Sequence, residues 1–272
     1  MTTPLVPSGH GPDLASRRFR LFRRQLNQLW EGYELTRATL PGVSTQLHQG
    51  AIAAVRFRYF AQPGNGKPLS ATDAAGAIDR YLVRTSPSHT LIQGIGYLEL
   101  LFSDLATLVL RDYPGRLQSN SPSDDNRDRK LMSIILESVD RPEILDRIVE
   151  EKVRGITYGS PRDFFLKDSA GLRFSDHFSV KHQDDLGLYE ELSARRNVWV
   201  HNDGRVDRKY LREVANSPFG LGHTASIPDN YLGDAMRLLR NLGTCVAFLT
   251  VQNNYAVAPR GELAAGFKAI HP

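Results

Sequence analysis

The sequence predicts an all-α protein, on two observations. Apolar residues recur at three- and four-residue spacing over several long stretches, and strand patterns do not alternate with them. Hydrophobic residues make up 41% of the chain and charged residues 24%, so there is enough material for a core and no sign of a disordered or fibrous protein. We expect a flexible tail at 1–15, an N-terminal helical extension at 16–85, a helical domain at 86–256 and a C-terminal tail at 257–272.

The composition also limits partners and location. A formal net charge of +4 permits an anionic partner without requiring one. The single cysteine, Cys245, excludes an internal disulfide framework and a Cys-rich metal cluster. The chain starts without an apolar signal core, and no apolar run approaches the roughly 18–20 residues that span a bilayer. We therefore expect a cytoplasmic protein without membrane contact.

The first predicted helix begins at Ser16 as its N-cap and ends at Pro41-Gly42. Its apolar stripe consists of Phe19, Phe22, Leu26, Leu29, Trp30 and Tyr33. The opposite side carries Arg17, Arg20, Arg24 and Gln28. This basic side is either a solvated face or a stripe that contacts RNA phosphates without reading sequence.

The middle of the chain is less regular. Residues 51–60 suit a short strand or an irregular helix, and a short helix is expected at 72–85. A long apolar helix from residue 91 ends before Pro114-Gly115. A polar loop at 118–128 precedes predicted helices at 130–139 and 142–153, and 158–182 reads as irregular.

Two helices end the predicted fold. One covers 184–200, and the other starts at Asp229. The stripe of the last helix contains Tyr231, Leu232, Ala235, Leu238, Leu239, Leu242, Val246 and Leu249. Cys245 joins this stripe, which predicts a core residue rather than a nucleophile.

The helix at 184–200 carries the chemistry. A helical projection puts an apolar face on it, made of Leu188, Tyr189, Leu192, Trp199 and Val200. Arg196 falls in the middle of that face. Since an unpaired buried charge is very costly, Arg196 must be paired, lie at an interface or line a pocket for an anion.

Ser193, Asn197 and His201 follow at four-residue spacing on a neighbouring stripe, so Asn197 can orient His201. Asn202-Asp203-Gly204 is a strong stop signal that puts His201 at the helix C-terminus, where the helix dipole favours positive charge. The histidine can move the proton of a ribose 2′-hydroxyl or protonate the leaving oxygen. The arginine can stabilise the charge of the transition state.

These residues resemble a known family. Arg196-Asn197 followed by His201 is similar to the Arg-x(4–6)-His motif of HEPN domains, and Asn202-Asp203-Gly204 and Val206-Asp207 with Tyr210-Leu211 resemble bacterial members. The resemblance covers about 184–255. It implies a helical bundle, a homodimer with paired motifs, metal-independent RNA endonuclease activity, and a role in toxin–antitoxin systems or antiviral defence, with a possible antitoxin or defence-system partner.

One position departs from the family pattern. Members paired with a nucleotidyltransferase often carry tyrosine two residues after the histidine, where this chain has Asp203. An antitoxin that modifies that tyrosine is therefore not expected.

The predicted catalytic residues are Arg196, Asn197 and His201. Substrate contacts are predicted for Arg195, Ser193 and Asn202, with no metal and no cofactor. Arg84 and His89 repeat the Arg–His spacing, but they flank Ser86-Pro87 in an expected linker and lack the amide.

Other readings of the same residues stay open. His177 and His182, with Asp176, Asp184 and Asp185 nearby, are five residues apart and do not share a helical face, which argues against a metal site. The chain could instead be a non-catalytic HEPN-type module that binds nucleotide or RNA or scaffolds a partner. A third reading is a helical interaction protein whose Arg196 pairs across a dimer. Arg196 could also pair with Glu137, Glu150 or another core acid, and His201 could cap its helix.

Overall fold

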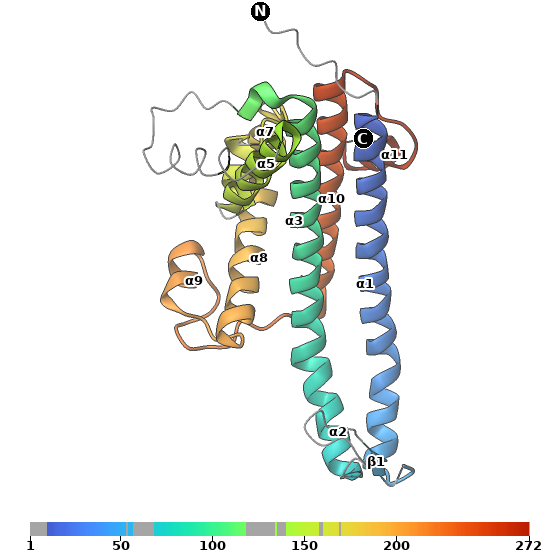
Figure 1. The fold of residues 1–272 in the computed structure, drawn as a ribbon. Helices are drawn as coiled ribbons and strands as arrows, with labels where there is room; N and C mark the ends of the chain where they lie inside the picture. Colours follow the sequence, from blue (N-terminus) through green and yellow to red (C-terminus); the bar gives the residue numbers. More distant parts are fainter. Residues whose placement is uncertain are drawn as a thin grey trace, which may run out of the picture. The chain divides into compact units, whose positions relative to one another are not determined.

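The computed structural model describes residues 10–52, 54–56, 68–117, 134, 140–157, 160–168 and 170–271, and confirms an all-α fold (Figure 1). The predicted loop at 118–128, most of the predicted helix at 130–139, and Glu137 lie outside the described residues. The longer helices are α1 (Gly11–His48), α3 (Ser86–Asp112), α5 (Arg141–Thr157), α8 (Gln183–Asn202) and α10 (Asp229–Tyr255). The shorter ones are α2 (Ala71–Arg80), α6 (Pro161–Leu166), α7 (His177–Lys181), α9 (Arg208–Glu213) and α11 (Gly261–Ile270), with a π-helical turn η1 (Tyr81–Thr85) and a 3-10 turn η2 (Pro114–Leu117).

The chain folds into two compact units. The first unit contains Met1–Arg24, Ile95–Ala194 and Arg237–Pro272, and the second contains Gln25–Gly94 and Arg195–Met236. Helices α1, α3, α8 and α10 each contribute residues to both units.

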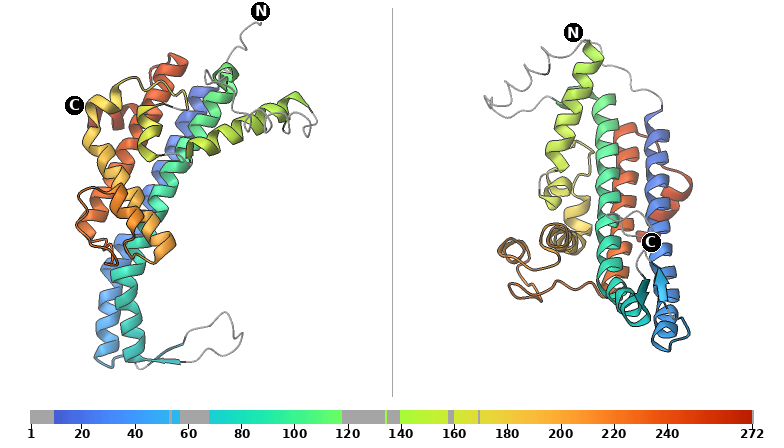
Figure 2. Two further views of the ribbon diagram at one scale, coloured as in Figure 1. Left: turned by 90° about the vertical axis from the view of Figure 1, so that its left-hand side faces the viewer. Right: turned by 60° about the horizontal axis from the view of Figure 1, so that its bottom comes forward.

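The core of the first unit is built where α1, α3 and α10 run side by side (Figures 1 and 2). Gly243 of α10 allows the close approach, because a Cβ atom there would lie 2.5 Å from the ring of Phe22 and 3.1 Å from Leu98. The segment predicted as irregular at 158–182 contains α6 and α7 and a cluster of buried aromatic rings. The cluster consists of Phe102, Phe164, Phe165, Phe174 and Phe178.

In the second unit, α1 does not end at Pro41-Gly42 as predicted but continues to His48. Proline removes one helical hydrogen bond, at a cost of about 3 kcal/mol in a helix interior. The continuation buries Leu47 against Ala74 and Ala75, which offsets that loss. Residues 54–56 form strand β1 (Ala54–Arg56), paired antiparallel with β2 (Pro68–Ser70), so the strand alternative for this region is confirmed.

The expected linker at Ser86-Pro87 is also wrong, because Ala71–Asp112 is one continuous helix. The turn before Pro87 is widened: the N–H of Ser86 donates to the carbonyl of Tyr81, five residues back. A wider turn relieves the clash of a proline ring with the preceding helical turn. By length and composition this helix could cross a membrane, but 44% of its most apolar window is buried inside the protein. The core helix of a soluble protein has the same properties, so this helix does not indicate where the protein is located.

The helices predicted at 184–200 and from Asp229 are confirmed, as α8 and α10. The predicted stripe of α10 is buried from Leu232 to Leu249, and Cys245 is fully buried within it. The predicted C-terminal tail contains α11, whose Leu263 is buried. The sequence thus identified α8 and α10, but not α7 and α11, among the helices that carry or adjoin the candidate residues.

Candidate functional site

Helix α8 ends where the stop signal predicted. Its last turn contains His201 and Asn202, and the backbone then turns left-handed, with φ of 52° at Asp203 and 79° at Gly204. The N–H of Gly204 donates to the carbonyl of Val198. A Cβ atom at Gly204 would lie 2.8 Å from the indole ring of Trp199, so this position requires glycine both for its backbone and for its space.

The buried face of α8 differs from the predicted one. Leu188 and Val200 are 37% and 48% exposed, whereas Val198 is buried. The arginine on the buried face is Arg195, which is only 4% exposed, and Arg196 is half-buried. Arg195 is thus the more deeply buried of two adjacent arginines, while Arg196, which the projection centred on the apolar face, is half-buried with its Nε atom buried.

Arg195 is held inside the second unit by contacts suited to a buried guanidinium. Its Nη1 donates to the carbonyl of Ser226 at 2.7 Å. Its charge lies 3.9 Å from the ring centroid of Tyr231 and 4.9 Å from that of Phe219. Cation–π contacts and a carbonyl acceptor offset part of the cost of burial. This placement favours a structural role for Arg195 over the predicted contact with substrate.

The segment after α8 is tied to the last turn of the helix. The indole Nε1 of Trp199 donates to the carbonyl of Ala225 at 2.8 Å, and the N–H of Ala225 donates to the carbonyl of Gly204 at 2.8 Å. Asn202 Nδ2 donates to Asp207 Oδ2 at 2.8 Å. Asn202, like Arg195, was predicted to contact substrate and instead forms a contact within the protein. The last turn of α8 is therefore fixed from several sides.

Arg84 also contacts the end of α8, although its Arg–His spacing was not predicted to be functional. Its guanidinium forms an ion pair with Asp203 and lies 5.4 Å from the ring centroid of Trp199. Its Nη2 also donates to the backbone carbonyl of Asp203 at 2.8 Å. Arg84 thus stabilises the left-handed residue that ends α8.

Two of the predicted catalytic residues, Asn197 and His201, do not take part in the contacts that hold the end of α8. Among the described residues, neither Asn197 nor His201 forms a side-chain hydrogen bond or ion pair, and His201 is exposed. One helical turn separates them, as predicted. Ser193, a turn earlier, is buried, and its hydroxyl has no hydrogen-bond partner in the described part of the chain. The fold therefore leaves Asn197 and His201 available to a ligand or partner.

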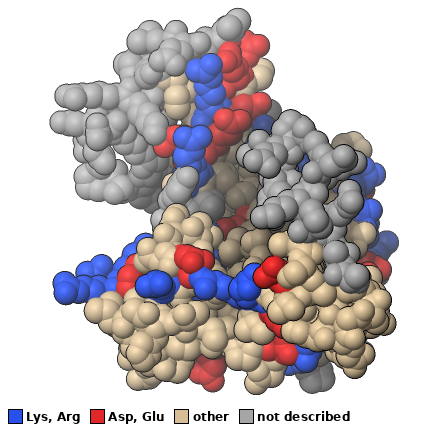
Figure 3. All heavy atoms as spheres, turned by 90° about the horizontal axis from the view of Figure 1, so that it is seen from below, with Lys and Arg blue, Asp and Glu red and all other residues tan. Residues whose placement is uncertain are grey.

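The charges do not form a continuous basic surface on the face drawn in Figure 3. A row of Lys and Arg side chains there is interrupted by Asp and Glu. The predicted basic side of α1 is exposed at Arg17, Arg20, Arg24 and Gln28, which fits both of its proposed roles.

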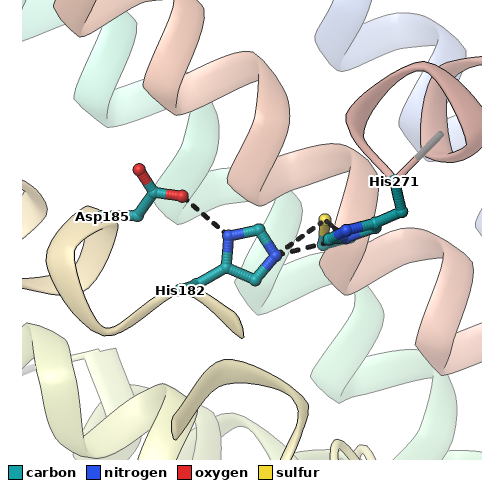
Figure 4. Close-up of polar contacts among 4 residues, drawn as sticks. His182, Asp185 and His271 are labelled. Atoms are coloured by element: carbon teal, nitrogen blue, oxygen red, sulfur yellow. Dashed lines mark hydrogen bonds and ion pairs between the residues drawn. The ribbon is translucent and has the colours of Figure 1, made fainter. Parts of the chain in front are cut away.

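The first unit contains a cluster of histidine and cysteine side chains that was not predicted from the sequence. His177 and His182 lie at the two ends of α7, Cys245 lies in α10, and His271 directly follows α11. Their ligand-capable atoms all lie within 4.8 Å of one another. Figure 4 shows Asp185, His182 and His271 with the sulfur atom between the two imidazoles.

Burial disfavours the charged forms of His177 and Cys245. Burial, followed by the charges of His182 and His271, lowers the pKa of His177 to about 4. Burial, with a smaller contribution from Asp185, raises the pKa of the Cys245 thiol to about 12. The five-residue spacing of His177 and His182 concealed the cluster, because Cys245 and His271 come from segments far away in the sequence.

No family model, curated protein or solved structure matches this chain.

Proposed function

We propose that this protein is a metal-independent RNA endonuclease of the HEPN type, with Arg196, Asn197 and His201 at its active site. The observation that carries the proposal is the contrast within one helical end. Arg195 and Asn202 are engaged in holding the fold, while Asn197 and the exposed His201 have no side-chain partner among the described residues. A histidine held rigidly by its neighbours but left free itself is suited to general acid–base catalysis.

The proposed reaction is attack of a ribose 2′-oxygen on the adjacent phosphorus. The bond from O2′ to phosphorus forms, the bond from phosphorus to O5′ breaks, and the products are a 2′,3′-cyclic phosphate and a 5′-hydroxyl. His201 accepts the proton of the 2′-hydroxyl, Asn197 orients the imidazole, and Arg196 stabilises the negative charge on the phosphorane-like transition state.

A homodimer is part of the proposal for a chemical reason. The reaction needs a base for the 2′-hydroxyl and an acid for the leaving O5′, and one motif supplies one histidine. Two motifs brought together by two copies of the chain would supply both groups. We further propose a cytoplasmic protein that acts on RNA in a toxin–antitoxin or antiviral setting, with an antitoxin or defence-system protein as its partner.

The test is cleavage of mixed cellular RNA by the purified protein in excess EDTA, with folding checked by circular dichroism in the same buffer. The His201→Ala variant is compared with His223→Ala, which changes another exposed histidine of the same unit. We expect cyclic-phosphate ends from the wild type and from His223→Ala, and a loss of at least about 100-fold in rate for His201→Ala, the usual scale of general acid–base catalysis.

Equal cleavage by both variants would show that another site, or a contaminant, cuts the RNA. Intact RNA with the folded wild type, with or without chelator, would refute catalysis and favour the non-catalytic module. RNA retention measured with the same variants would then test that alternative.

A further inference from the structure

We propose that His177, His182, Cys245 and His271 form a zinc-binding site that fastens the C-terminal helix α11 to the first unit. The four residues come from three separate parts of the chain, 177–182, 245 and 271, which the fold brings to one point. The inference does not depend on the ribonuclease proposal, since it concerns other residues and another unit.

The distances between these atoms match a tetrahedral zinc site. Zinc lies about 2.0–2.1 Å from histidine nitrogen and about 2.3 Å from cysteine sulfur, so tetrahedral angles separate two nitrogens by about 3.3 Å and a nitrogen from sulfur by about 3.6 Å. His182 Nε2 and His271 Nε2 are 3.3 Å apart. Cys245 Sγ lies 3.6 Å from His271 Nε2 and 3.8 Å from His182 Nε2. The spacing of these three atoms is therefore that of three corners of a tetrahedral zinc site.

The imidazole of His182 is oriented as in a metal ligand. Its Nδ1 lies 2.7 Å from the carboxylate of Asp185, so Nδ1 carries the proton and the lone pair is on Nε2 (Figure 4). That lone pair is directed at Cys245 and His271. A carboxylate behind a ligating histidine is the usual outer support of zinc sites, because it fixes the ring and raises its basicity.

The fourth ligand, His177, supplies an independent observation. Its Nε2 is buried and has no hydrogen-bond partner among the described residues. Its ring lies against Phe178 and Phe267, with centroid distances of 5.3 and 5.8 Å. A buried polar atom without a partner destabilises the fold, and coordination to zinc would supply the missing partner.

The chemistry of the four donors selects the ion. Three imidazole nitrogens and one sulfur suit a borderline-soft dication and exclude calcium and magnesium, which take oxygen ligands. On binding, the thiol of Cys245 loses its proton to solvent and the thiolate bonds to the metal. A complete set of four protein ligands leaves no open position, so the site is structural rather than catalytic. Since His271 follows α11 directly, the bond to zinc would hold that helix against α10.

The experiment uses untagged full-length protein, stripped of metal and titrated with Zn²⁺ against a chromophoric chelator, then with Co²⁺ followed by absorption spectroscopy. We expect one Zn²⁺ per chain, and for Co²⁺ the strong visible bands of tetrahedral coordination with a thiolate-to-metal charge-transfer band. His271→Ala should weaken Zn²⁺ binding by more than about 100-fold, and Asp185→Asn, which changes only the outer support, by about 10–100-fold. Cys245→Ser should abolish the charge-transfer band.

His223→Ala, a histidine of the second unit, is the matched control and should bind Zn²⁺ as the wild type does. His271 ends the described chain after its last helix, so its variant is expected to fold, which circular dichroism checks. The proposal is overturned if the folded wild type binds no stoichiometric Zn²⁺, or if its affinity is the same in His271→Ala and Cys245→Ser.

Discussion

The end of α8 offers a controlled comparison of two glycines. Gly204 and Gly222 both belong to the second unit and both have φ of +79°. An alanine at either position would therefore be destabilised by the left-handed backbone conformation. That cost is about 1–2 kcal/mol. The two positions differ in their surroundings, because a Cβ atom at Gly204 would lie 2.8–2.9 Å from three ring atoms of Trp199, whereas nothing lies within 4 Å of one at Gly222.

Gly222→Ala is therefore expected to lose about 1–2 kcal/mol of unfolding free energy. Gly204→Ala should lose that amount and, in addition, the cost of forcing an atom into a filled space, about 1–3 kcal/mol. For a chain of this size the extra loss corresponds to a melting temperature about 2–12 °C below that of Gly222→Ala. Thermal unfolding followed by tryptophan fluorescence measures it.

The same pair tests the support of the proposed active site. Displacing Trp199 breaks its hydrogen bond to Ala225 and loosens the turn that carries His201. RNA cleavage should therefore fall further in Gly204→Ala than in Gly222→Ala at a temperature where both variants are folded. Indistinguishable melting temperatures for the two variants would refute the reasoning, because the ring contact is the difference that the structure shows between them.

Three further predictions concern other parts of the molecule. Gly243→Ala places a Cβ atom 2.5 Å from the ring of Phe22 and should lower the free energy of unfolding by about 1–3 kcal/mol. Gly96→Ala, at an open position inside a helix, should raise it by about 0.5–1 kcal/mol. Urea unfolding measures both variants, and changes of the same sign would contradict the prediction. Zn²⁺ at 100 times its dissociation constant should add about 2.7 kcal/mol, or about 5–11 °C in melting temperature, and a melting curve indifferent to Zn²⁺ and EDTA would count against the site. Tyr33→Phe removes a hydrogen bond to the carboxylate of Asp229 and should lose about 1.5–3 kcal/mol at neutral pH. Burial and then Asp229 raise the pKa of Tyr33, so its contribution is complete below about pH 10 and is lost as pH rises through the folded-state pKa; unfolding titrations should show the variant with a weaker alkaline decline.

The sequence predicted the helices whose apolar spacing is strong and whose ends carry clear signals. Asp229 begins α10 as predicted, and Asn202-Asp203-Gly204 ends α8 as predicted. The errors lie where distant contacts outweigh local preference. Pro41 did not end α1, because the continued helix buries Leu47 against residues of α2 and this burial stabilises it. The sequence around Pro41 gives no information about that distant contact.

The cluster of His177, His182, Cys245 and His271, which we propose binds zinc, was missed for a related reason. His177 and His182 are close in sequence, but five residues on a helix point in different directions, which argued against a shared ligand. The fold resolves this by ending α7 between them, so that His182 lies beyond the helix. Cys245 and His271 then complete the set from segments that sequence spacing cannot connect.

The arginines of α8 illustrate how a sound physical principle can be applied to the wrong residue. A buried arginine was expected to need a partner, and the structure meets that need with a carbonyl and two aromatic rings, but at Arg195. A projection of 3.6 residues per turn separates neighbours by about 100°. The buried residues Ala194 and Val198 lie on the side of α8 that carries Arg195. Arg196, the next residue, is half-buried with its Nε atom buried, and it lies on the turn that leads to His201.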